Sequence, residues 1–322
     1  MPPLTRPCAA RLGQLLSAIL LAGCLLLAAL PARANSLMFC DRPPAQSAAQ
    51  KNRLLLFSEA VKQVLQRSGS QAAIVARAGL DLGRFGIRYS HAGISLQQSP
   101  NTPWSVRQLY YACDDSQPHI YDQGLSGFLL DSHQQDSAYV SIVLLPQPAE
   151  QQLLAAALNR EQVLAMLGAD YSANAYAFSS QYQNCNQWLM ELLASAWGNL
   201  PAGVPAREAA QHWLQQQQYQ PSTVDVKYGF MVWAAYFVPL LHNGDHPAAN
   251  LVARHYQVSM PAAIDQFVQT QWPASRRIEL CVRGEQLVVH QGWDNIADGC
   301  QPGAQDLVRP LEQAAASAAP LS

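Results

Sequence analysis

The stretch NCNQWLMELLASAW, residues 184–197, changes from polar side chains to a mostly apolar run. Its apolar residues recur at helical spacing, and Asn184 is a residue type that caps helix N-termini. We therefore predict a helix that begins at Cys185 and ends near Gly198. A cysteine in that position is half of a disulfide, a small core residue or a nucleophile, and the rest of the chain helps to decide.

The N-terminal residues have the composition of an export signal. Arg6 and Arg11 precede the apolar run AILLAGCLLLAAL, and small residues follow before Ala34. We predict a secretory signal peptide over residues 1–34, cleaved after Ala34. LAGC, ending at Cys24, offers a lipoprotein anchor as an alternative, but LLLAAL follows where a lipidated chain would turn polar. The run is short for a membrane span and no later run is long enough, so we expect a soluble exported protein, most simply periplasmic.

The charge of the chain argues against one class of partner. Its 322 residues carry a net charge of −2, and the mature chain, without the basic residues of the leader, is at about −5. There is no basic stripe or nucleic-acid motif, so we expect no nucleic-acid partner. Charged residues make up only 13% of the chain, which indicates a compact fold rather than a disordered one.

Five cysteines follow the predicted leader. Cys281 and Cys300 flank a predicted hairpin, in which RGEQ joins RIELCV to QLVVHQGW, and they form a natural local disulfide pair. Cys40 and Cys113 could form a second bridge. That pairing leaves Cys185 odd, which in an exported protein indicates a reactive thiol or an intermolecular bond. A bridge from Cys185 to Cys40 or Cys113 stays open, because connectivity cannot be deduced from sequence.

The remaining segments predict an α+β fold, since strands come first, then helices, then mixed elements. We divide the mature chain into a core over residues 35–200, a mixed extension over 201–310 that contains the hairpin, and a disordered tail over 311–322. Helical spacing covers residues 48–69, 149–158, 160–167 and 206–218, and strand-like patterns cover residues 71–79, 86–96, 104–113 and 138–146.

Two motifs carry residues suited to covalent chemistry. SHAGIS, residues 90–95, places His91 at the start of a strand, and NCNQW places Cys185 at the start of a helix. A thiol reacts as its thiolate, whose fraction rises at a helix N-terminus and beside an imidazolium. A histidine can take the thiol proton and later protonate a leaving group. Alternation along WSVRQLYY puts Val106, Gln108 and Tyr110 on one strand face, and we predict that Gln108 orients the His91 ring.

Other candidate side chains have plainer interpretations. Asn184 and Asn186 flank the cysteine and are candidate binding residues. Trp104 and Tyr121 could line a pocket, although packing is the default. HNGDH, residues 242–246, offers two histidines and an aspartate, but Asn-Gly indicates a turn and no third ligand is evident, so we predict no metal site and no cofactor. In YGFMVWAAYFVPLL we expect the aromatic side chains to pack in a core or to cover a groove, among them Trp233, Tyr236 and Phe237.

These motifs resemble two known groups. The strand histidine of SHAGIS, the strand WSVRQLYY and NC at the head of a helix look like the circularly permuted NlpC-like branch of the papain superfamily, in which the histidine precedes the cysteine. The chain as a whole also resembles an exported bacterial family, domain of unknown function 2145. This likeness runs through FCDRP, GLDLGRFGIRYSHAGIS, PNTPWSVRQLYYAC, YDQGL, YSANAYAFSSQYQNCNQW and VSMPA.

The papain-like resemblance implies a small antiparallel sheet with a cysteine-bearing helix. It also implies Cys185 as nucleophile, His91 as base and Gln108 as the third residue. Permuted relatives usually have an acidic residue or a histidine at the third place, whereas a glutamine can orient the ring but cannot stabilise imidazolium by charge.

Two functions fit this sequence. One is an exported cysteine hydrolase or acyltransferase that acts on an amide or ester, with a cell-envelope peptide or lipid as the expected substrate. The other is a catalytically inactive envelope module that binds a peptide, lipid or protein partner. An enzyme needs the Cys185 thiol close to His91 and reachable from solvent.

Overall fold

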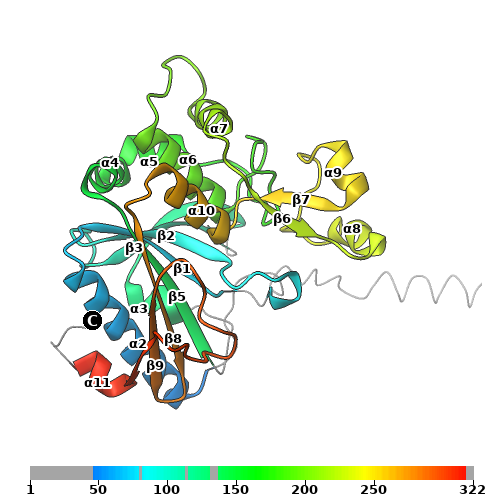
Figure 1. Cartoon of the computed structure of the whole chain (residues 1–322). Coiled ribbons are helices and arrows are strands. Elements are labelled where there is room, and N and C mark those ends of the chain that lie inside the picture. The colour runs from blue at the N-terminus through cyan, green and yellow to red at the C-terminus, as the bar shows by residue number, and fades with distance from the viewer. Residues whose placement is uncertain (1–45, 80–81, 113–114, 131–136, 317–322) are drawn as a thin grey trace, which may run out of the picture. The chain divides into compact units, whose positions relative to one another are not determined.

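An antiparallel sheet organises the described residues, with eight strands in the order β10-β9-β8-β5-β1-β2-β3-β4 (Figure 1). The computed structural model describes residues 46–79, 82–112, 115–130 and 137–316. The predicted signal peptide and the cysteines Cys24, Cys40 and Cys113 lie outside these ranges. The strands are β1 (Ala72–Arg77), β2 (His91–Leu96), β3 (Ser105–Ala112), β4 (Gln117–Gln123), β5 (Ser137–Leu144), β8 (Arg276–Arg283), β9 (Gln286–Gln291) and β10 (Leu307–Pro310).

Helices cover both faces of this sheet (Figure 1). On one face lie α2 (Ala48–Arg67), α3 (Leu125–Leu130) and α11 (Leu311–Ala316). On the other lie α4 (Gln147–Leu158), α5 (Arg160–Ala165), α6 (Cys185–Trp197), α7 (Ala206–Gln216) and α10 (Pro261–Gln271). The predicted α+β class is therefore confirmed, and α6 begins and ends as its capping pattern indicates.

Burial on both faces explains the continuous apolar run over residues 72–76 in β1, at the centre of the sheet. Along β1, Ile74 and Ala76 pack in the core beneath α4 and α6, which we call the α6 core, whereas Ala73 and Val75 pack in the core beneath α2 and α3, which we call the α2 core. Strand side chains alternate between faces, so a strand covered on both sides reads as a continuous apolar run.

A smaller hairpin stands beside the large sheet. It pairs β6 (Ser222–Asp225) with β7 (His255–Val258), and α8 (Gly229–Ala235) and α9 (Ala248–Ala253) lie in the connection between them. Tyr256 and Val258 form the centre of its own small core. We call residues 222–258 the hairpin lobe.

The extension predicted over residues 201–310 contributes to the main sheet. Its hairpin, β8 and β9, pairs through β8 with β5, and the predicted disulfide between Cys281 and Cys300 is confirmed. Strand β4 was not expected, because QPHIYDQ is mostly polar. It pairs with β3 along its full length.

Two expectations about the C-terminal third are wrong. Residues 311–316 were expected to be disordered but form α11, because Leu311 and Ala314 are buried against α2. The aromatic residues of YGFMVWAAYFVPLL were expected in a core or over a groove, but Trp233, Tyr236 and Phe237 are exposed by 66%, 66% and 68%. Within the described residues, no helix has the length and apolar composition needed to cross a bilayer.

Candidate functional site

The imidazole of His91 is held by Gln108 on the neighbouring strand. Nε2 of His91 is hydrogen bonded to Oε1 of Gln108, and both residues are buried. Gln108 in turn donates from Nε2 to Oε1 of Gln123 on β4 at 2.6 Å. The structure therefore contains the contact between the two side chains that the strand alternation predicted.

Gly93 leaves the space that this contact needs. It lies two residues after His91 on the same face of β2, beside Val106 and Gln108 of β3. A Cβ at position 93 would lie 2.6 Å from Cγ1 of Val106 and 2.8 Å from the Arg107 carbonyl oxygen. A side chain would not fit between the strands, so the glycine of SHAGIS is required by close packing.

The hydrogen bond also assigns the protons of the ring. The amide oxygen of Gln108 can only accept, so Nε2 of His91 carries the proton. In the neutral imidazole this leaves the lone pair on Nδ1. Nδ1 is therefore the nitrogen that can act as a base.

Cys185 occupies the first position of α6 and is buried, with 6% of its surface exposed. Cys40 and Cys113, the alternative disulfide partners of Cys185, lie outside the described residues, so a bridge to either of them stays a prediction. Asn184 caps the helix, since its side chain accepts a hydrogen bond from the Gln187 backbone at 2.7 Å. The backbone N–H groups of the first turn point away from the helix, where the helix dipole favours negative charge.

Asn186 joins the start of α6 to the start of β2. Its Nδ2 donates to the carbonyl oxygen of Ser90 at 3.0 Å, so the residue after Cys185 binds the residue before His91. Oδ1 of Asn186 is buried and has no hydrogen-bond partner within the described part of the chain. A buried carbonyl oxygen in that state is costly, and in a functional site it is a ready acceptor for a ligand.

Cys185 and His91 belong to different faces of the sheet. Ala92 packs with Cys185 in the α6 core. His91 points the other way, and its ring centroid lies 5.9 Å from that of Phe128, which belongs to the α2 core.

A buried charged network fixes the loop that leads into Cys185. Glu191 of α6 is fully buried, and Arg207 of α7 binds its two carboxylate oxygens at 2.7 and 3.1 Å. Gln211 donates to the same carboxylate at 2.7 Å and Gln183 at 2.5 Å. Arg207 also donates to the carbonyl oxygens of Ser180 and Tyr182 in the loop.

The burial of this network affects the pKa of the Glu191 carboxyl group. Burial raises the pKa of Glu191, and Arg207 and the two glutamine amides oppose that shift. Sequence reasoning missed these residues, although a glutamate inside the apolar run WLMELL is a signal that could have found them, because a buried charge requires a partner.

The remaining predicted residues have structural environments. Trp104 is buried in the α2 core, and Tyr121 is 43% exposed on β4 with its ring edge-on to Tyr110. In HNGDH, His242 stacks on Tyr182 at 4.6 Å, and Nε2 of His246 bonds the Asn174 carbonyl oxygen at 2.6 Å. Across the described residues, no group of three or more histidine, cysteine, aspartate or glutamate side chains is arranged to hold a metal ion.

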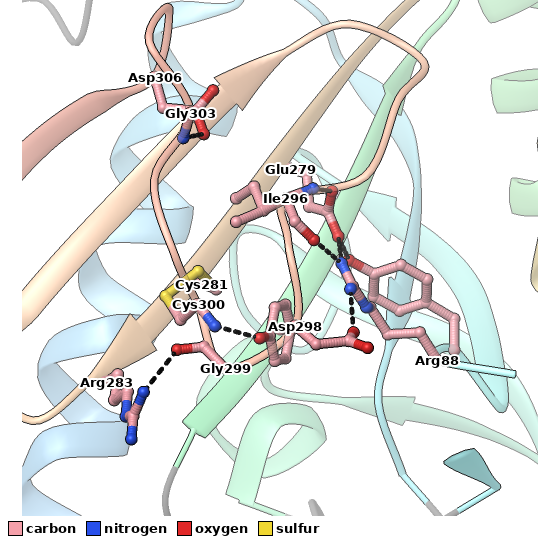
Figure 2. The surroundings of a disulfide bond; sticks show 12 residues. Arg88, Glu279, Cys281, Arg283, Ile296, Asp298, Gly299, Cys300, Gly303 and Asp306 are labelled. Carbon is pink, nitrogen blue, oxygen red and sulfur yellow. Dashed lines mark hydrogen bonds and ion pairs between the residues drawn. A yellow bond between two sulfur atoms is a disulfide. The ribbon is translucent and has the colours of Figure 1, made fainter. Parts of the chain in front are cut away.

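The disulfide loop is tied to the segment that enters β2. Arg88 donates to Glu279 of β8 at 2.9 Å, to the Ile296 carbonyl oxygen at 2.6 Å and to Asp298 at 2.6 Å (Figure 2). Because Arg88 stands three residues before His91, the loop closed by Cys281 and Cys300 supports the approach to the candidate site.

Comparison with protein families gives one match. A family model described as an uncharacterized protein conserved in bacteria (DUF2145) covers residues 64–268. No curated protein and no solved structure matches the chain. The matched range includes β1 to β5, α4 to α7 and most of α10, and with them Cys185, His91 and Gln108.

Proposed function

The chain belongs to the bacterial family DUF2145, and for this member we propose an exported thiol hydrolase or acyltransferase that acts on an amide or ester. Cys185 is the nucleophile, His91 the base and Gln108 the residue that orients His91. The observation that carries the proposal is the hydrogen bond from His91 Nε2 to Gln108, which places the basic lone pair on Nδ1.

The chemistry uses the groups already described. The Cys185 thiolate attacks the carbonyl carbon, a sulfur–carbon bond forms, and the first-turn N–H groups of α6 face the developing oxyanion. The carbon–nitrogen or carbon–oxygen bond then breaks, and the leaving group takes the proton from the His91 imidazolium. Water or a second nucleophile cleaves the thioester and restores the thiol. In this proposal Asn186 Oδ1, which has no hydrogen-bond partner among the described residues, accepts an N–H of an amide substrate once the substrate displaces the groups that bury it.

The order of histidine strand, polar strand and cysteine helix supports a circularly permuted papain-like arrangement of the NlpC type. Recognition of such an arrangement depends on the roles of the residues rather than on their order in the chain. The substrate that fits an exported protein of this kind is a peptide or lipid of the cell envelope, and we place the protein in the periplasm. The disulfide between Cys281 and Cys300 is compatible with that compartment.

A catalytically inactive module is the second candidate. The burial of Cys185, with 6% of its surface exposed, favours it. The packing of Cys185 in the α6 core and of the His91 ring against Phe128 of the α2 core favours it as well. In this case the papain-like shape binds a peptide, lipid or protein partner without turnover.

Alkylation with iodoacetamide at mildly acidic pH distinguishes the two candidates. We expect rapid modification of Cys185 in the native protein, located by mass spectrometry, and a strong loss of rate in His91→Ala. The matched control is His119→Ala, which removes a histidine of β4 that is hydrogen bonded to Asp115. Labelling of Cys185 only after denaturation, or equal rates in wild type and His91→Ala, would leave the inactive module as the function.

A further inference from the structure

The hairpin lobe exposes a cluster of aromatic side chains. Phe230 and Trp233 on α8 and Phe237 just after it are exposed by 68%, 66% and 68%, and Tyr228 and Tyr236 at the two ends of α8 by 60% and 66%. Val252 on α9 is exposed by 86%. We call the five aromatic residues the aromatic patch. Contiguous exposed apolar surface of this kind usually marks an interaction site.

The residues of the aromatic patch do not belong to the face of α8 that packs against the small core of the lobe. Val232 of α8 packs with Val226, Tyr256 and Val258 in the small core of the lobe, so α8 has an inward face already. The outward side chains contact one another instead. Trp233 meets Phe237 edge-on at 4.8 Å, and Tyr228 stacks on Phe230 at 5.8 Å.

Exposed cations border the aromatic patch. Lys227 precedes Tyr228, and Nη1 of Arg254 lies 3.9 Å from the Cβ position of Gly229, the first residue of α8. Two acidic residues occur in the lobe. Asp225 is bonded to His255, and Asp245 is buried and accepts from the Tyr176 backbone at 2.8 Å. Because Asp225 is itself 69% exposed, the exposed formal charges of the lobe are two cations, Lys227 and Arg254, against one carboxylate, and the two cations are the ones that adjoin α8.

We propose that the aromatic patch binds the surface of a bilayer that contains anionic phospholipid. Tryptophan and tyrosine place an apolar ring and a polar tip in the headgroup region, and phenylalanine inserts beside them. Lys227 and Arg254 pair with the anionic headgroups. A second copy of the chain is a poorer occupant, because joining two patches brings like charges together without neutralising them.

Binding of the aromatic patch to a bilayer would hold the loop before Cys185 close to that bilayer. The lobe is joined to the loop before Cys185, since Ala173 donates to the Leu240 carbonyl oxygen at 2.8 Å and Ala177 to that of Gln257 at 3.1 Å. A bilayer held by α8 would therefore lie on the same lobe that supports the nucleophile loop. The binding itself depends only on the lobe surface and does not require Cys185 to react.

Co-sedimentation with lipid vesicles tests the proposal. The vesicles contain phosphatidylcholine and phosphatidylglycerol in a ratio of about three to one, with pure phosphatidylcholine as the neutral comparison. We expect wild type to sediment with the anionic vesicles. Phe230→Ser/Trp233→Ser/Phe237→Ser should lower the partition coefficient at least roughly tenfold, because it removes apolar surface from the contact.

Two further variants make the outcome specific. Leu55→Ser/Leu158→Ser/Leu164→Ser removes exposed apolar side chains outside the lobe, with exposed fractions of 46%, 42% and 44%, and should bind as wild type does. Lys227→Glu/Arg254→Glu should lose the preference for anionic vesicles. All proteins carry the same N-terminus, so the apolar run before residue 35 contributes equally to each. Circular dichroism verifies that each variant is folded.

Three outcomes of these experiments would contradict binding of the aromatic patch to an anionic bilayer. Wild type that stays in the supernatant with both vesicle types contradicts the proposal. So does equal binding by wild type and the aromatic variant. A dimer in light scattering that disappears in the aromatic variant, without vesicle binding by wild type, would assign the aromatic patch to a second copy of the chain instead.

Discussion

The hydrogen bond between His91 and Gln108 determines which ring nitrogen carries a proton. Three neighbouring residues make it possible. Gly93 leaves room between the strands, Gln123 bonds the amide nitrogen of Gln108, and Phe128 lies against the ring. Gln108 offers a neutral acceptor, so it orients the ring without lowering the energy of the imidazolium by charge.

Replacing Gln108 tests whether this orientation matters. Gln108→Leu removes the acceptor, and we expect the rate of Cys185 alkylation to fall roughly tenfold, as the loss of one hydrogen bond worth about 1.4 kcal/mol would cause. Gln108→Glu supplies a charged acceptor, stabilises the imidazolium and should extend the reactive range to higher pH. A pH–rate profile for iodoacetamide measures both, and identical profiles for all three proteins would contradict the role of Gln108.

Helix α6 depends on the charged network at its centre. Glu191 projects from α6 into a site closed by α7 and by the loop before Cys185, and each polar partner of its carboxylate comes from one of those segments. The network therefore couples the position of Cys185 to α7.

Removing Arg207 should leave a buried, uncompensated carboxylate. We expect Arg207→Met to lower the free energy of unfolding by about 3–5 kcal/mol. Glu191→Gln/Arg207→Met should be more stable than Arg207→Met alone, because the remaining group is neutral. Urea titrations of the three proteins measure these differences, and a double variant no more stable than the single one would show that the carboxylate charge is not the cause.

The contact of α10 with β8 predicts a pH dependence of stability. Burial raises the pKa of Asp265 to about 6, although Arg277 lies 3.2 Å away and opposes the shift. The folded state then holds more protons than the unfolded state between about pH 4 and pH 6, so stability falls as the pH rises through that window. The loss is complete above about pH 6 and amounts to at most about 3 kcal/mol.

Asp265→Asn isolates this contribution. The difference in free energy of unfolding between wild type and the variant should change between about pH 4 and pH 6 and stay constant above it, because the amide does not titrate. Urea titrations at a series of pH values give this difference directly. A difference that does not vary with pH would mean that Asp265 titrates at its ordinary value.

The sheet connects segments that are far apart in the sequence. The β8–β9 hairpin pairs with β5, and Arg88 binds both Glu279 of β8 and the loop that the disulfide closes (Figure 2). The C-terminal hairpin is thus part of the support for the segment that carries His91. The predicted division into residues 35–200 and 201–310 does not include the pairing of β5 with β8, because composition carries no information on strand pairing.

Removing the disulfide should weaken the whole molecule. The bridge spans a sequence separation of 19 residues. A loop of that size constrains the unfolded chain by about 3 kcal/mol, so Cys281→Ala/Cys300→Ala should lower the free energy of unfolding by roughly that amount. Arg283→Ala, which removes only an exposed hydrogen bond to Gly299, is the control and should change stability by less than about 0.5 kcal/mol. Equal midpoints in urea for both variants would contradict the estimate.

The amino-acid sequence by itself determined the features that depend on near neighbours. The Asn184 cap, the helical periodicity after Cys185, the alternation that directs Gln108 toward His91 and the local pair Cys281–Cys300 all follow from short-range geometry. The tertiary structure alone decided the placement of Cys185 and His91 on opposite faces, the pairing of β8 with β5 and the exposure of the aromatic patch. The physical reason is that burial and strand order depend on which distant segments pack together, and periodicity shows that a face is apolar without showing what covers it.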